Sequence, residues 1–341
     1  MAIVGGFDVH RKQITFDYLD IETGCISRGE IRPVCRRSLR SFLSRRFEGK
    51  QVAIALEATT GWRFVVEELL AMGVEVHLAE PADTRALRGP KKRAKNDRED
   101  ARHLRELLHR GQLPESWIPP AHIQELRTLV RLRKNLIDER RQWKQRIQAA
   151  LFHQGLPSMT LNRKGRARLP ELGLSPAAQI AVQLAVRMIE ALEVELKPLE
   201  RQLWELARRI PACLALMANH YGIGLITAVA IVAEYGDASR ISNSGKAVRC
   251  AGLDITVWES DGKRAPGHLS RQGPEVLRWA LFEAAQCACR KASPDHAYYQ
   301  QVKSERGHNQ ACLSVARKLM RRAHHTLREL GSQALDLEPA A

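Results

Sequence analysis

Residues 52–57 read Val-Ala-Ile-Ala-Leu-Glu, five consecutive apolar side chains followed by a carboxylate. An unbroken apolar run of this length is typical of a central strand whose two faces are both covered. Strands of this kind belong to sheets with crossover helices, so the run predicts an α/β domain around it. Glu57 ends the run and is a candidate for chemistry, because a buried carboxylate without a partner is costly.

The segments on both sides of this run complete an α/β pattern over residues 1–118. Three strands precede the run, and helices and one more strand follow it. The expected strands cover residues 3–7, 13–19, 25–32, 52–56 and 74–78, and the expected helices cover 38–47, 62–72 and 97–110. Three strands followed by alternating helices and strands predict a mixed sheet with crossover connections.

A region predicted to be helical and elongated follows, over residues 119–210. Its clearest feature is a row of apolar residues spaced three and four apart, the a/d pattern of a coiled coil. The row consists of Val182, Ala185, Ile189, Leu192, Leu196, Leu199, Leu203, Leu206 and Ile210. Pro198 lies inside the row and predicts a kink or a local break. The row can pair with a second expected helix, 123–152, as an antiparallel hairpin, or with another copy of the chain.

The third region, residues 211–335, is predicted to be mostly helical, with a polar interruption from 254 to 273. Gly222 and Gly224 precede an apolar stretch and permit a tight turn. The backbone N–H groups of such a turn can face a phosphate at a helix N-terminus. A Gly-x-Gly pair is also common in turns without a ligand, so both interpretations stay open.

The seven cysteines of the chain are scattered, and no two show the two-residue spacing of a zinc site. Cys287-Ala-Cys289 stands alone. The pattern favours reduced thiols that pack as small hydrophobic side chains.

The charge balance is strongly basic, with 54 Lys and Arg against 38 Asp and Glu and a formal net charge of +16. A basic chain of this size usually binds a polyanion, most often nucleic acid. No apolar run approaches the length of a membrane span, and the first residues lack the layout of a signal peptide. We therefore expect a cytoplasmic protein that associates with the nucleoid and has no membrane partner.

Four carboxylates in the first region form a candidate metal site. Asp8 ends the first strand and Glu57 ends the central strand, while Asp97 and Asp100 lie three apart at the start of a helix and so share one face. Magnesium prefers oxygen ligands, and two ions can activate an attacking oxygen and stabilise a leaving one. Clustered carboxylates repel one another unless cations neutralise them. The alternative is structural: strand-end acids, and helix-start acids that complement the helix dipole.

Basic residues surround the acidic pair. The candidates for contact with a nucleic-acid backbone are Lys91, Lys92, Arg93, Lys95 and Arg102. Phosphodiester chemistry needs the backbone held beside the metal, which such residues can do. The alternative is a solvated, charged face.

Three N-terminal segments carry a resemblance to a known family: Gly6-Phe7-Asp8-Val9, Leu56-Glu57-Ala58-Thr59-Thr60-Gly61 and Lys95-Asn96-Asp97-Arg98-Glu99-Asp100-Ala101-Arg102. They resemble the DEDD transposases, an insertion-sequence family that includes Piv-type DNA invertases and bridge-RNA-guided recombinases. The resemblance implies a ribonuclease H-like N-terminal domain, similar to the Holliday-junction resolvase RuvC. It also implies that the metal-binding tetrad consists of Asp8, Glu57, Asp97 and Asp100.

The C-terminal half resembles the second domain of that family, in the segments Tyr221-Gly222-Ile223-Gly224, Cys250-Ala251-Gly252-Leu253 and Leu277-Arg278-Trp279-Ala280-Leu281. The family carries a nucleophilic serine in the polar segment after Ala-Gly-Leu, which implies Ser260 here. Asp261 stands between this serine and Gly262, whereas the family pattern has glycine directly after serine. Ser270 is the second candidate, and Arg271 beside it is a predicted nucleic-acid contact.

The resemblance implies a DNA transposase or recombinase that uses one or two Mg²⁺ ions and a phosphoserine intermediate. Some members are guided by a structured RNA. The expected partners are therefore donor and target DNA, a structured guide RNA and further copies of the chain, as a dimer or tetramer. Two alternatives remain: a RuvC-like junction nuclease that only hydrolyses, and a non-catalytic nucleic-acid-binding scaffold.

Overall fold

The computed structural model describes residues 2–89, 96–265 and 267–339. In the segment from 258 to 265, the side chains of residues 258, 260 and 263–265 lie outside the description. The chain divides into two compact units, Met1–Ile118 and Pro119–Ala341 (unit 1 and unit 2), and each is described by itself.

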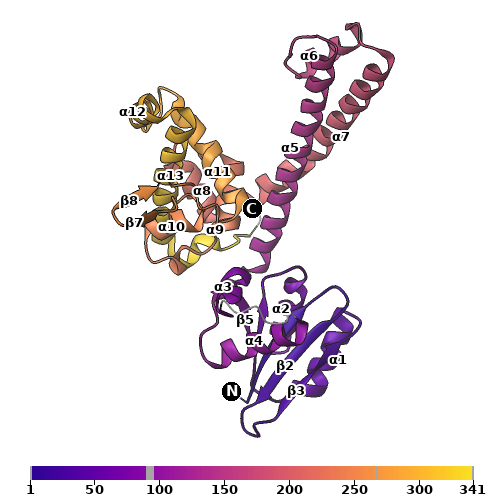
Figure 1. The fold of residues 1–341 in the computed structure, drawn as a ribbon, viewed down its shortest axis with the longest axis vertical. Coiled ribbons are helices and arrows are strands. Elements are labelled where there is room, and N and C mark those ends of the chain that lie inside the picture. Colours follow the sequence, from indigo (N-terminus) through magenta and orange to yellow (C-terminus); the bar gives the residue numbers. More distant parts are fainter. Residues whose placement is uncertain (1, 90–95, 266, 340–341) are drawn as a thin grey trace. The chain divides into compact units, whose positions relative to one another are not determined.

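Unit 1 is built on a mixed sheet (Figure 1). Its strands are β1 Ile3–Val9, β2 Ile14–Asp20, β3 Ile26–Ile31, β4 Val52–Glu57, β5 Glu75–Ala79 and β6 Glu115–Ser116, in the spatial order β3-β2-β1-β4-β5-β6. The first three strands pair antiparallel, and β4 and β5 run parallel to β1. The predicted mixed sheet is therefore confirmed.

Helices cover both faces of this sheet. They are α1 Arg36–Phe47, α2 Trp62–Ala71, α3 Pro81–Ala86 and α4 Asp97–His109. On one face α1 and α2 enclose a core rich in aromatic side chains, among them Phe7, Phe16 and Phe42. On the other face α4 packs through Leu104 against the small side chains Ala55 and Ala79. Small residues on this face let α4 lie close to the strands, which matters for the site described below.

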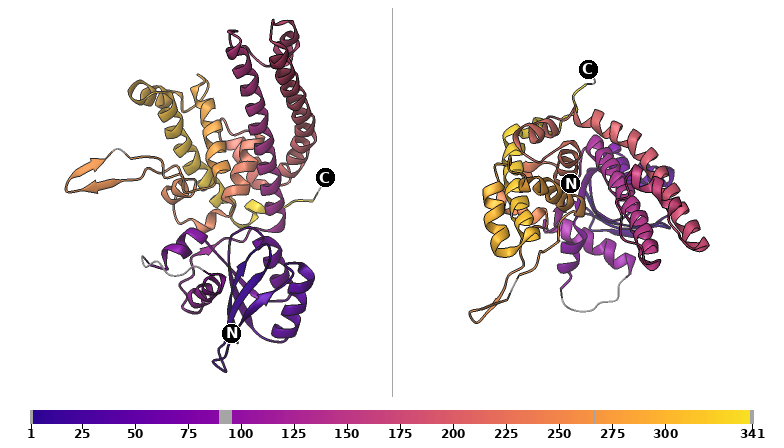
Figure 2. Two further views of the ribbon diagram at one scale, coloured as in Figure 1. Left: turned by 45° about the vertical axis from the view of Figure 1, so that its right-hand side comes forward. Right: turned by 90° about the horizontal axis from the view of Figure 1, so that it is seen from above.

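Unit 2 is helical apart from one short ribbon. Its elements are α5 Ala121–His153, α6 Arg163–Arg168, η1 Leu169–Glu171, α7 Pro176–Ala207, α8 Pro211–Asn219, α9 Leu225–Tyr235, η2 Ala238–Arg240, α10 Ser244–Cys250, β7 Trp258–Ser260, β8 Lys263–Ala265, α11 Glu275–Gln286, η3 Cys287–Cys289, α12 His296–Arg306, α13 His308–Leu330 and η4 Gly331–Leu335. The long helices α5 and α7 lie side by side, with α6 at the far end of the pair (Figures 1 and 2). The predicted helical character of this half is confirmed.

The row of apolar residues predicted on α7 is buried from Val182 to Leu203. After Leu203 the next buried position is Ala207, and Leu206 is only half-buried. A straight helix has 3.6 residues per turn, so its buried face drifts away from positions that are spaced strictly three and four apart. The local break predicted at Pro198 is wrong, since α7 runs through it without interruption. Association of this region with a second copy stays a prediction.

Helices α5, α7, α8 and α11 pack on α9, whose residues from Ala228 to Tyr235 are all buried. An internal ion pair ties α5 to this helix, because both guanidinium Nε and Nη2 of Arg131 donate to the buried carboxylate of Glu234, at 2.6 and 2.7 Å. None of the described helices combines the length and the apolar character that crossing a membrane requires.

Candidate active site

The first two candidate carboxylates lie at one edge of the sheet. Strands β1 and β4 are adjacent and parallel, with Phe7 opposite Leu56. Asp8 directly follows Phe7, and Glu57 directly follows Leu56. The strand register therefore brings the backbones of Asp8 and Glu57 next to each other. The carboxyl ends of parallel strands are a common place for functional side chains in open α/β sheets.

Helix α4 reaches this edge because β1 has no side chain at Gly6. A methyl group on Gly6 would lie 2.1 Å from the carbonyl oxygen of Ala101 and 2.7 Å from the backbone nitrogen of Arg105. Any larger residue would therefore push α4 off the strand. The close approach decides where the acidic start of α4 lies.

A buried ion pair fixes the other side of α4. The Nε of Arg105 on α4 lies 2.5 Å from one carboxylate oxygen of Asp17 on β2, and the Nε of Arg28 on β3 lies 2.7 Å from the other. The side chain of Arg105 is only 6% exposed and that of Asp17 only 3%. Because both charges are desolvated, loss of either would leave a costly unpaired charge. This network is structural and ties α4 to strands β2 and β3.

The start of α4 presents Asp97 and Asp100 toward Asp8. Asn96 caps the helix, accepting a hydrogen bond from the backbone N–H of Glu99 at 2.8 Å. Nε2 of His10 lies 3.1 Å from Oδ2 of Asp8 and 3.5 Å from Oδ1 of Asp97. The ligand atoms of Asp8, His10 and Asp97 all lie within 4.8 Å of one another. The end of β1 and the start of α4 thus contribute to one cluster.

The electrostatics of Asp8 reflect this cluster. Burial raises the pKa of Asp8 above its ordinary value, His10 acts against the rise, and Asp100 and Asp97 add to it. Asp8, Asp97 and Asp100 therefore repel one another when ionised, and a bound cation would relieve the repulsion. The donor set, carboxylate oxygens with one imidazole, suits a hard divalent ion.

His10 and Arg88 were not predicted as site residues. His10 lies two residues after Asp8, just past the end of β1. Its closeness to Asp8 along the chain is the only feature of the sequence that marks it as a site residue. Arg88, which follows α3, forms an ion pair with the carboxylate of Asp100. Glu57 is half-buried at the end of the neighbouring strand and is not part of the closest group.

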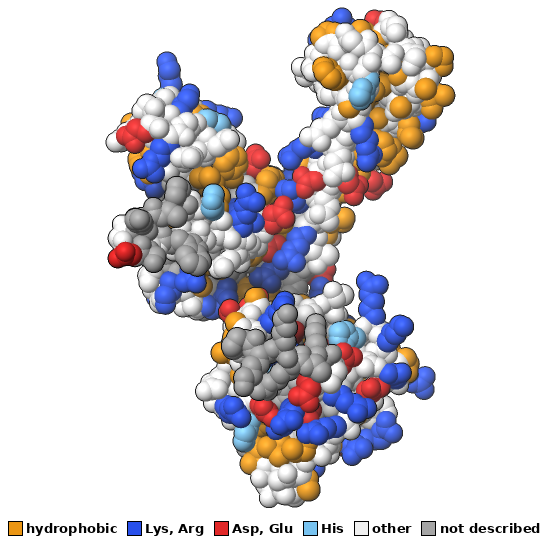
Figure 3. Space-filling model, in the orientation of Figure 1, with side chains coloured by type: hydrophobic (Ala, Val, Ile, Leu, Met, Phe, Trp, Pro, Cys, Tyr) orange, Lys and Arg blue, Asp and Glu red, His pale blue; other side chains and the backbone are white. Residues whose placement is uncertain are grey.

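Of the predicted backbone contacts, Lys91, Lys92, Arg93 and Lys95 lie outside the described residues. Arg102 is exposed and pairs with Glu106, with 2.8 Å between Nε and Oε1. With Arg28 and Arg98 it lines a hollow of about 310 Å³ beside Asn96, at the start of α4. Lys and Arg side chains are spread over the visible face of unit 1 (Figure 3).

Ser260 lies in unit 2 at the end of β7. It pairs with Lys263 on β8, so that Asp261 and Gly262 alone form the connecting turn. Both turn residues have positive φ, 51° and 72°, which is the type I′ geometry that Asp-Gly adopts readily. Asp261 therefore has a structural role as the first turn residue, and the ribbon β7–β8 extends away from the helices of unit 2 (Figure 2).

Ser270 is in a different setting. Its hydroxyl donates a hydrogen bond to the carboxylate of Asp254, and its backbone N–H donates to the carbonyl of the same residue at 3.0 Å. The next residue, Arg271, has a positive φ of 53° and is exposed, so its guanidinium can reach a ligand from solvent. Ser270 thus has the satisfied hydroxyl of a turn residue.

The two glycines before α9 have separate explanations. Gly222 has a φ of 91°, and a methyl group there would lie 2.4 Å from the carbonyl oxygen of Ala284, so close packing on α11 already requires glycine. Gly224 is the N-cap of α9, and no neighbouring atom lies near the position of its missing Cβ. An anion at that N-terminus stays a prediction.

Comparisons with known proteins agree with these observations. A family model described as Transposase, for the DEDD transposases of the IS110 group, matches residues 5–153, and a second, described as Transposase IS116/IS110/IS902 family, matches residues 214–300. The first match implies a ribonuclease H-like fold for unit 1, in agreement with its mixed sheet.

Individual relatives are more distant. The chain is 26% identical over 301 residues to the "Probable family 20 transposase" of Pseudomonas aeruginosa, covering 84% of this chain and 87% of the relative. It is 25% identical over 279 residues to the "Transposase for insertion sequence element IS1111A" of Coxiella burnetii, covering 78% and 74%. A relative from Sinorhizobium fredii, also named as a transposase, is 30% identical over 209 residues, which are 58% of this chain and about half (49%) of that protein.

Proposed function

Since this chain belongs to the IS110 family of insertion-sequence transposases, we propose that it cuts and rejoins DNA with the carboxylates of unit 1 and a serine of unit 2. The observation that carries the proposal is the cluster of Asp8, His10 and Asp97, in which the end of β1 and the start of α4 place ligand atoms within 4.8 Å of one another. Burial raises the pKa of Asp8, Asp100 and Asp97 add to the rise, and a perturbed carboxyl within a cluster of this kind is more frequent at functional sites than elsewhere.

We assign the metal site to Asp8, Asp97 and Asp100, with Glu57 at the neighbouring strand end. One or two Mg²⁺ ions bound there would supply charge neutralisation at the phosphodiester and activation of the reacting oxygens. His10 contacts both Asp8 and Asp97 and so holds the two carboxylates toward each other. Arg88 keeps Asp100 on the same side.

We propose Ser260 as the nucleophile. Its Oγ would form a bond to phosphorus while the bond from phosphorus to the 3′-oxygen breaks, and the proton lost by the serine would end on that 3′-oxygen. A 3′-hydroxyl of another strand would then attack the phosphoserine, and the serine would recover its proton. The number of phosphoester bonds does not change, so no ATP is needed. The Asp261–Gly262 turn would hold Ser260 at the end of β7.

The proposed partners are donor and target DNA, a structured guide RNA and further copies of the chain. The net charge of +16 supports the nucleic-acid partners. For self-association, the support is a row of apolar side chains exposed on α7 at helical spacing, Ile180, Leu184 and Met188 (Figure 3). Exposed apolar rows of this kind often mark contacts between protein chains.

The test is trapping of a covalent adduct. The full chain is incubated with labelled donor DNA, any RNA that the element encodes and Mg²⁺, then denatured and examined for protein bound to DNA. We expect an adduct with the wild type and with Ser270→Ala, and none with Ser260→Ala or Asp8→Ala. Cleavage that survives Ser260→Ala without any adduct would indicate a hydrolytic junction nuclease instead. Binding without cleavage in every variant would indicate a scaffold.

A further inference from the structure

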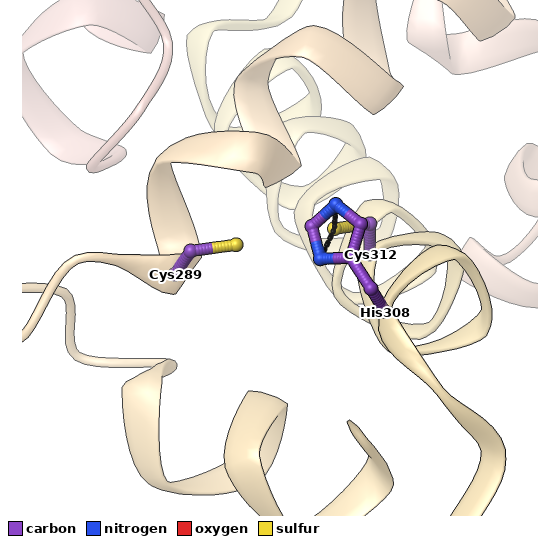
Figure 4. A group of neighbouring side chains, drawn as sticks. All are labelled: Cys289, His308 and Cys312. Carbon is purple, nitrogen blue, oxygen red and sulfur yellow. Dashed lines mark hydrogen bonds between the residues drawn. The ribbon is translucent and has the colours of Figure 1, made fainter.

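Unit 2 contains a second group of metal-ligating side chains that the proposed reaction does not use. Cys289 lies on η3, and His308 and Cys312 lie on the first turns of α13. Their ligand atoms are all within 4.8 Å of one another, and the three side chains point toward one another (Figure 4). Cys289, which with Cys287 has no zinc-site partner nearby in the sequence, is brought by the fold to residues 19 and 23 positions further on.

The spacing of the donors suits a small soft cation. His308 and Cys312 are four residues apart on one helix and therefore share a face. Sγ of Cys312 lies 3.8 Å from both ring nitrogens of His308. A tetrahedral zinc site, with bonds of about 2.3 Å to sulfur and about 2.0 Å to nitrogen, needs donors roughly 3.5–3.8 Å apart. The present arrangement needs shifts of about 1 Å or less to meet that geometry.

A neighbouring side chain orients the histidine. The hydroxyl oxygen of Tyr299 on α12 lies 2.9 Å from Nδ1 of His308, and Tyr299 is buried. Zinc-binding histidines usually have their second ring nitrogen held in this way by a polar partner. With Nδ1 engaged by Tyr299, Nε2 is the nitrogen left for a metal.

We propose that Cys289, His308 and Cys312 bind one zinc ion, with a water molecule as the fourth ligand. His308 is exposed, so an ion and a water molecule can enter from solvent. The ion would join η3 to α13 and so close the hairpin of α12 and α13. This site is separate from the carboxylates of unit 1, whose oxygen donors suit harder ions.

The chain offers a matched control. Cys287 lies only two residues from Cys289 on the same short helix, but it packs beside Gly222, where a methyl group would lie 3.0 Å from its Cβ. It does not belong to the group of ligand atoms found among the described residues. Cys287→Ser therefore removes a thiol from the same element without removing a proposed ligand.

The experiment measures bound zinc in the full chain. Wild type and variants are incubated with zinc chloride in the presence of a phosphine reductant, separated from free metal by gel filtration and analysed by mass spectrometry for metal per chain. We expect about one zinc per chain for wild type and for Cys287→Ser, and almost none for Cys289→Ser or His308→Asn. Cobalt in place of zinc should give thiolate charge-transfer absorption only in the first two.

His308→Asn keeps the proposal testable if a cysteine variant misfolds, because His308 is exposed. Without metal its melting temperature should fall slightly, because Tyr299 loses its hydrogen-bond partner, and added zinc should raise the melting temperature of wild type and of Cys287→Ser but not that of His308→Asn. Three results would overturn the proposal: no zinc on the wild type, equal zinc on His308→Asn and wild type, or loss of zinc in Cys287→Ser matching that in Cys289→Ser.

Discussion

Replacement of Asp8 by asparagine tests the cluster through stability, without depending on catalysis. Burial raises the pKa of Asp8, and the nearby Asp97 and Asp100 raise it further. A carboxyl whose folded pKa lies above its unfolded value contributes stability that is fully present below the unfolded pKa and is lost as pH rises through the folded pKa. At neutral pH the ionised Asp8 therefore destabilises the metal-free protein. Asp8→Asn should be more stable than wild type under those conditions.

The size of the effect follows from the separation of the charges. Two unit charges 4.8 Å apart, the limit for the ligand atoms here, repel by about 3.5 kcal/mol at an effective dielectric of about 20 and by about 0.9 kcal/mol at about 80. The side chain of Asp97 is 42% exposed, so solvent screening favours the lower value. We expect a gain of about 1 kcal/mol, which corresponds to roughly 4 °C in the melting temperature of a unit this size.

The stability difference between Asp8→Asn and wild type is measured by denaturation of the full chain across a pH series, with and without Mg²⁺. Without metal, the advantage of Asp8→Asn should shrink as the pH falls through the pKa of Asp8. With Mg²⁺, the wild type should gain stability and the variant should not. The control is Asp17→Asn, which should lose about 3–5 kcal/mol because it leaves the buried Arg105 without its partner. A metal-free Asp8→Asn that is less stable than wild type at neutral pH would refute the reasoning.

Three further changes test other parts of the argument. Gly6→Ala should destabilise unit 1 by about 3 kcal/mol and abolish strand transfer, since its methyl group collides with the backbone of α4, and thermal denaturation would measure this. Asp261→Ala should lower the yield of covalent adduct relative to wild type, because alanine at a positive φ costs about 1 kcal/mol more than aspartate and weakens the exposed turn beside Ser260. Leu196→Glu combined with Leu203→Glu should unfold the pair α5–α7, since both side chains are buried, and circular dichroism should show the loss of helix. If any of the three variants behaves like wild type, the structural reason given for that variant is wrong.

The strands and the carboxylates of unit 1 were predictable because both leave local signals. The apolar run at 52–56 ends in Glu57, and the spacing of Asp97 and Asp100 sets one face of α4, as the structure has it. Helix α3 and strand β6 were missed because six and two residues are too short to show a period.

Long-range neighbours were not predictable in the same way. His10 belongs to the cluster only because α4 packs on β1 and brings Asp97 to it, across 87 residues of sequence. Cys289 meets His308 only because α12 turns the chain back before α13. Neither pairing leaves a periodic or compositional trace in the sequence.

The position of the candidate carboxylates is therefore set by residues outside the proposed metal site. Gly6 fixes the distance between α4 and β1, and the ion pair of Arg105 with Asp17 fixes the lateral position of α4 on the sheet. The proposed ligands on α4 lie one to two turns before Arg105, so a small rotation of the helix about this anchor would separate Asp97 and Asp100 from Asp8. Because the sheet supplies Asp8 and Glu57 and the helix supplies the other two, the site exists only when the helix is docked. Folding of unit 1 and assembly of the proposed metal site should consequently be one event.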